Sequence, residues 1–179
     1  MSSSSCFTVA KITSKMIAEI LEEYYDELQD QMIDIGGNIM ILPNGEIEVS
    51  RYETYYDAPK TLMDILHILL EMIDDNYMYI DGNDIGVSNC SELVQRLLRE
   101  TEFVVDSIEH AEITIMADGD DELEDDIDDE YLFDDISDTV GLETIVTTYD
   151  KKTGVLNTHR TFEQDWDDIF RMNMWKNIR

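Results

Sequence analysis

The excess of carboxylates over bases is the feature that most limits how this chain can fold. Residues 17 to 150 hold 38 acidic side chains, while the only bases in that stretch are Arg51, Lys60, Arg96 and Arg99. Two like charges about 4 Å apart repel by about 1 kcal/mol in water, and by several times more near a low-dielectric surface. A folded form must therefore spread most of its carboxylates over the outside, where solvent screens them.

The chain is nevertheless expected to fold, because 43% of its 179 residues are hydrophobic. Disordered chains lack the apolar surface that offsets the entropy of ordering. The formal net charge is -30, whereas a magnitude of about 2 to 8 keeps a small domain soluble. We therefore expect the acidity to serve the binding of something positive.

Apolar residues recur at helical spacing from Ile17 to Ile35, and Gly36-Gly37 follows as a stop, which predicts one amphipathic helix over residues 14–35. At 100° per residue, the acidic positions between Glu19 and Asp34 form a stripe roughly opposite the apolar face. Side chains four apart are separated by about 6 Å along a helix axis, close to the spacing of successive phosphates in a nucleic-acid strand.

Two hairpins are predicted, one over residues 38–50 around Pro43-Asn44-Gly45 and one over residues 142–162 around a Lys-Lys-Thr-Gly turn. A short strand is predicted at Tyr77–Ile80, before the Asp81-Gly82 turn, and another at Glu112–Ala117, where the residues alternate.

A second helix is predicted to open at Asp57-Ala58-Pro59 by its cap and first-turn proline. Asn89 with Glu92 predicts a capping box for a third helix, and a last helix is expected around Trp166 to Trp175. The expected fold class is α+β, a single domain over residues 1–179 with helices packed on a small antiparallel sheet built from hairpins.

The stretch from Asp118 to Asp135 is acidic at twelve of its eighteen positions. Such a run is usually a disordered tail or a solvated face. Leu123, Ile127 and Tyr131 lie four apart, however, so a helical turn would attach the segment to the body. The sequence leaves order and flexibility equally open here.

Motifs of catalysis are missing: we find no nucleophile elbow, phosphate-binding glycine loop or zinc-ligand spacing. His67 lies three residues after Asp64 and four before Glu71, which indicates local ion pairing. Residues 81–92 resemble a calcium loop, but Ile85 stands where an oxygen ligand is needed, so we expect a turn before a capped helix. No catalytic residue, metal or cofactor is expected.

A cytoplasmic location is expected, because Met1 to Ala10 has neither the basic nor the apolar region of a secretory signal. No stretch approaches about 18 uninterrupted apolar residues, so we expect no membrane insertion. Cys6 and Cys90 are too few for a disulfide scaffold.

In charge, size and absence of catalytic motifs the chain resembles the acidic DNA-mimic inhibitors, a functional class that includes phage anti-restriction proteins and some anti-CRISPR proteins. That resemblance implies a non-enzymatic inhibitor that blocks the basic nucleic-acid channel of a prokaryotic defence nuclease, without binding nucleic acid itself. The oligomeric state stays open. The expected partner-binding residues are the carboxylates of the first helix and of the acidic segment: Glu19, Glu22, Glu23, Asp26, Glu27, Asp30, Asp34, Asp118, Asp120, Asp121, Glu122, Glu124, Asp125, Asp126, Asp128, Asp129, Glu130, Asp134 and Asp135.

Two other functions remain open on the sequence. One is an antitoxin or immunity protein that neutralises a basic toxin through a shaped interface, in which only a few carboxylates matter. The other is a module that responds to divalent cations, since carboxylate clusters bind such ions loosely.

Overall fold

The computed structural model describes residues 6–52, 57–118 and 141–164. Its main feature is a six-stranded sheet in the order β2-β3-β1-β6-β7-β8, in which every neighbouring pair is antiparallel. The strands are β1 (Cys6–Thr13), β2 (Asn38–Ile41), β3 (Glu46–Tyr52), β6 (His110–Asp118), β7 (Gly141–Asp150) and β8 (Val155–Gln164).

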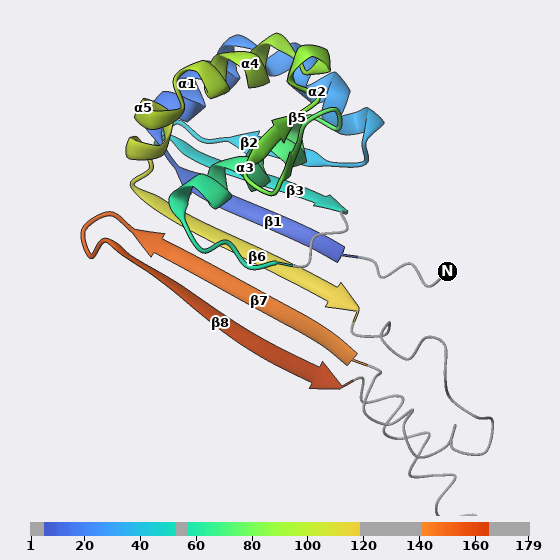
Figure 1. Cartoon of the computed structure of the whole chain (residues 1–179), viewed down its shortest axis with the longest axis vertical. Coiled ribbons are helices and arrows are strands. Elements are labelled where there is room, and N and C mark those ends of the chain that lie inside the picture. Colours follow the sequence, from blue (N-terminus) through green and yellow to red (C-terminus); the bar gives the residue numbers. More distant parts are fainter. Residues whose placement is uncertain (1–5, 53–56, 119–140, 165–179) are drawn as a thin grey trace, which may run out of the picture.

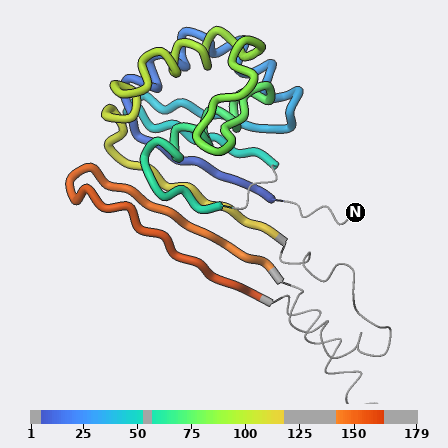
Figure 2. Tube along the Cα trace, in the orientation of Figure 1, coloured from blue at the N-terminus to red at the C-terminus, as the bar shows by residue number. Residues whose placement is uncertain are grey.

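Helices cover one half of this sheet. Figure 1 shows them gathered over β2, β3 and β1, whereas β7 and β8 extend past the helical layer; the chain trace in Figure 2 shows the same separation. The helices are α1 (Lys15–Glu23), α2 (Tyr25–Asp34), α3 (Leu62–Ile73), α4 (Glu92–Arg99) and α5 (Thr101–Asp106), with a 3-10 turn η1 (Val87–Asn89). A small hairpin of β4 (Met78–Ile80) and β5 (Asn83–Ile85) forms a second sheet. The predicted α+β class is thus confirmed.

The core lies between the sheet and α3. Eight of the twelve residues of α3 are buried. They belong to the same hydrophobic core as the buried side chains of β1, which alternate along the strand from Cys6 to Ile12. No periodic pattern predicts the strand at residues 6–13, although Thr8, Val9 and Ile12 are β-branched. Because β1 lies between β3 and β6, it joins two groups of strands into one sheet that is larger than the small one expected.

Both predicted hairpins are confirmed as β2–β3 and β7–β8. The strands predicted near Tyr77 and Glu112 are confirmed as β4 and β6. Asp81 and Gly82 connect β4 to β5, both with positive φ, so the calcium-like segment begins as a hairpin turn. The predicted helix around Trp166 lies outside the described residues.

Two predicted helix starts are wrong. The second helix is capped by Thr61 rather than opened at Asp57-Ala58-Pro59: the Thr61 hydroxyl accepts the Asp64 N–H, and the Asp64 carboxylate accepts the Thr61 N–H. This reciprocal pair satisfies two N–H groups that a helix start otherwise leaves open. The third helix is capped by Ser91, because Asn89 already belongs to the 3-10 turn.

Buried Asp74 connects the end of α3 to the start of α4. One carboxylate oxygen accepts the Ser91 N–H at 2.7 Å, and the other accepts the Asn76 N–H at 3.0 Å. A buried carboxylate is tolerated only where hydrogen bonds replace its hydration, so these donors hold Asp74 and the turn after α3 in place.

Candidate protein-interaction surface

An acidic surface is formed by the outward sides of α1 and α2. Ser14 caps α1 by accepting the Ile17 N–H at 3.2 Å, and α1 buries Ile17 and Leu21 while α2 buries Leu28 and Met32. Burying these positions turns the acidic ones toward solvent. We call the exposed carboxylates of the two helices the acidic helical face: Glu19, Glu22, Glu23, Asp26, Glu27, Asp30 and Asp34.

The single helix predicted over residues 14–35 is wrong, because the chain breaks at Tyr24. There φ is -111° and ψ is 17°, and the Tyr24 N–H bonds to the carbonyl of Leu21 at 3.2 Å. The ring of Tyr24 packs against the core, and the break lets α2 contact β2 and α3 while α1 contacts β3 and α4. The expected single row of carboxylates is therefore two shorter rows, one on each helix.

Bases neutralise part of the acidic helical face. Glu19 pairs with Lys15 at 3.9 Å along α1, and Glu23 pairs with Arg96 of α4. The hydrogen bond that Arg96 donates to the Glu23 carboxylate raises the pKa of Arg96. The other five carboxylates make no ion pair with any base in the described part of the chain. They are Glu22, Asp26, Glu27, Asp30 and Asp34.

The second group of predicted partner-binding residues is almost entirely outside the described chain. Asp118 ends β6. The remaining members, Asp120, Asp121, Glu122, Glu124, Asp125, Asp126, Asp128, Asp129, Glu130, Asp134 and Asp135, lie between residues 119 and 140, outside the described residues.

His67 is buried instead of pairing locally with Asp64 and Glu71. Its Nδ1 hydrogen-bonds the Tyr77 hydroxyl at 2.5 Å, and that hydroxyl donates to Asp84 Oδ1 at 2.6 Å. The ring of His67 stacks on Tyr79 with centroids 3.5 Å apart. Loss of hydration in this site lowers the pKa of His67, against the opposing charge of Asp84.

This chain of hydrogen bonds joins α3 to the β4–β5 hairpin. Burial also raises the pKa of Tyr77 above its ordinary value, and its hydrogen bond to Asp84 adds to that effect. A neutral imidazole donating from Nδ1 to a neutral phenol is the protonation state that these shifts favour. The arrangement holds the hairpin in place, and it contains no activated nucleophile. Sequence spacing missed Tyr77 because it contacts His67 through the tertiary fold.

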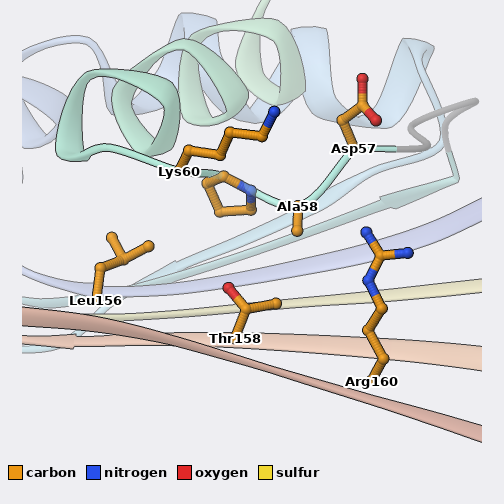
Figure 3. A pocket seen from close by; sticks show the side chains of 7 residues that line it. Asp57, Ala58, Lys60, Leu156, Thr158 and Arg160 are labelled. Carbon is orange, nitrogen blue, oxygen red and sulfur yellow. The ribbon is translucent and has the colours of Figure 1, made fainter.

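A second candidate is a hollow of about 490 Å³ between β8 and residues 57–60. Figure 3 shows Leu156, Thr158 and Arg160 rising from β8 toward this segment, while the ends of Lys60 and Asp57 point away from the strand. The charged ends of Lys60 and Arg160 therefore do not converge on one point, and the lining lacks the geometry needed to clamp an anion.

No cluster of three or more His, Cys, Asp or Glu side chains suited to a metal ion occurs within residues 6–52, 57–118 and 141–164. Within the same ranges, no helix has the length and apolar character needed to cross a membrane.

Comparison with known proteins gives no match to the chain among family models, curated proteins or solved structures.

Proposed function

We propose that this protein is an acidic nucleic-acid mimic of the anti-restriction or anti-CRISPR type. It occupies the basic nucleic-acid-binding channel of a prokaryotic defence nuclease and excludes the nucleic acid by competition. The observation that carries the proposal is the acidic helical face, on which five exposed carboxylates have no base to neutralise them within the described chain.

Lys and Arg side chains that line such a channel are placed to contact phosphates. Carboxylates at a spacing of about 6 Å along a helix meet the same cations at nearly the same separation. Opposite charges on two proteins speed up their encounter and fix their relative orientation more than they raise the affinity. Rigid helices also lose little entropy on binding, because the core already fixes their apolar sides.

A shaped interface to a basic toxin is the second candidate function, and the β4–β5 hairpin favours it. Met78 and Ile85 face each other across the two strands, and both are exposed together with Ile80. Apolar anchors of this kind dominate affinity in interfaces that depend on a few residues.

Capture on the immobilised full chain from host lysate, followed by elution with duplex DNA, identifies the partner. A nuclease that is released by the duplex and loses its nucleic-acid binding in the presence of the chain supports mimicry. A partner that the duplex cannot displace contradicts it, because competition for one channel is the central claim.

Charge-neutralising variants then locate the contact. One variant replaces Glu22, Asp26, Glu27, Asp30 and Asp34 by their amides; the matched control replaces Asp81, Glu92, Glu100, Glu102 and Asp106, which are also exposed. Both remove five negative charges. We expect the first to weaken binding at least about tenfold and to flatten its salt dependence, and the control to change it less than about threefold. Equal losses would mean that only net charge matters.

The same assay with Met78→Ser and Ile85→Ser tests the second candidate. If these two substitutions abolish binding while the neutralised variant still binds, the shaped-interface function replaces the mimic.

A further inference from the structure

β8 is a long edge strand of the main sheet. It pairs with β7 without a break from Asp150↔Val155 to Gly141↔Gln164, and no described strand pairs with its other side. Its ten residues span about 33 Å. The opposite edge strand, β2, has four residues. Natural proteins usually shorten, bulge or cover an edge, because its open backbone groups are a template for another strand.

β8 lacks several of those protections. Its sequence contains no proline, and the helical layer does not reach it (Figure 1). Val155 and Phe162 are each 50% exposed. Half-exposed apolar side chains beside open backbone groups are typical of a strand that gains a neighbour.

We propose that β8 pairs antiparallel with β8 of a second copy of this chain, about a two-fold axis at His159. The pairing joins two six-stranded sheets into one. It goes beyond the proposed function and does not depend on it.

The axis position follows from the side chains. Side chains that lie opposite each other in an antiparallel pair point to the same face of the sheet, and the faces alternate along each strand. Two identical strands can therefore pair only about a centre that lies on a residue, not between two residues. A centre at His159 places exposed Phe162 opposite Leu156 of the other copy, twice across the axis. A centre at Arg160 would oppose two guanidinium groups, which is unfavourable. A centre at Thr161 would pair only residues 158–164 of β8.

Charge repulsion between the copies is weak at this edge. The helices of the acidic helical face contact β2 and β3, and β3 lies four strands from β8, about 19 Å at the usual strand spacing. Charges are screened over about 8 Å at physiological salt. In the joined sheet the two acidic helical faces therefore lie at opposite ends, several screening lengths apart.

The ends of β8 also differ in charge. Glu163 lies near one end, and Lys152, which makes no ion pair with any described residue, lies in the turn before the other. Antiparallel pairing brings the Glu163 end of each copy beside the Lys152 end of the other. Antiparallel pairing also keeps the two copies apart at the end of each sheet where β6 stops, at Asp118, and β7 starts, at Gly141.

Cysteine cross-linking of the full chain tests the register. His159→Cys places one thiol directly opposite its symmetry mate, within the range that a disulfide spans. We expect a covalent dimer on mild oxidation, at least about fivefold faster than for Asn157→Cys or Thr161→Cys alone. Those two positions face each other, so mixing their variants should restore fast cross-linking. Buried Cys6 and Cys90 make the unsubstituted chain a suitable background.

Sedimentation of the unsubstituted chain provides an independent test. We expect a species of twice the 20.8 kDa monomer mass, whose fraction rises as salt screens the remaining repulsion. Binding to a basic partner should weaken over the same salt range, so failures of the two proposals are distinguishable. The pairing would be overturned if the chain sedimented as a monomer at about 100 μM at every salt concentration and if the cysteine variants at residues 157, 159 and 161 cross-linked at equal rates. The pairing would also be overturned if hydrogen exchange showed the β8 amides protected only after a partner protein is added. The edge would then accept a strand of that partner instead of a second copy.

Discussion

Glu23 on α1 and Arg96 on α4 form an ion pair between residues 73 positions apart in the chain. The pair fastens α4 beside the acidic helical face and supplies one of the few bases near it. The folded chain thus neutralises one carboxylate of this face through a contact that helical spacing could not reveal.

Replacing Arg96 by Gln should lower the midpoint of thermal unfolding slightly at low salt, because exposed ion pairs contribute little and are screened. Arg99→Gln is the matched control, since it removes an exposed base of the same helix that has no ion pair with a described residue. The two variants should unfold at the same temperature in about 1 M NaCl. An equal midpoint at low salt would contradict a stabilising Glu23–Arg96 pair.

Tyr77→Phe should destabilise the protein by about 1 to 3 kcal/mol, because it leaves the buried Nδ1 of His67 without its hydrogen-bond partner. Urea unfolding followed by circular dichroism measures the change. Tyr79→Phe is the control: it keeps the ring that stacks on His67 and should cost less than about 1 kcal/mol. Similar losses in both variants would mean that the hydroxyl of Tyr77 has no special role.

Stability should fall with pH below about 6.5 through His67. Its pKa is lower in the folded state than the ordinary 6.5, so the unfolded chain binds more protons between these two pKa values. The stabilisation is therefore complete above pH 6.5 and is lost as the pH falls toward the folded pKa. Unfolding free energies at pH 7.5 and 5.5 should differ more for the unsubstituted protein than for His67→Gln.

The control for this pH dependence is His110→Gln, which removes an exposed histidine of β6. It should keep the difference between the two pH values. If His67→Gln also keeps that difference, other groups cause the pH dependence.

Asp74→Ala should cost about 3 kcal/mol, because the N–H groups of Ser91 and Asn76 lose a charged acceptor inside the protein. Asp74→Asn keeps one acceptor oxygen and should lose less. Equal unfolding free energies for the two variants would show that the carboxylate does not join α3 to α4 as described.

The hairpins could be predicted because alternation and turn residues are local signals: Pro43-Asn44-Gly45 specifies its own turn. The outward position of the acidic side chains was likewise encoded by periodicity, since burying Ile17 and Leu28 sends their polar neighbours to the surface. The break at Tyr24 has no such signal. Neither glycine nor proline occurs there, and the helix ends because α2 packs on β2 and α3.

By itself, then, the sequence determined an α+β chain whose carboxylates must face outward, because hydrophobic period and charge act through neighbouring residues. Only the tertiary structure decided that β1 is central, that Arg96 reaches Glu23 and that His67 hydrogen-bonds Tyr77. These contacts join segments distant in the chain, and their energies depend on a shared core that no local pattern encodes.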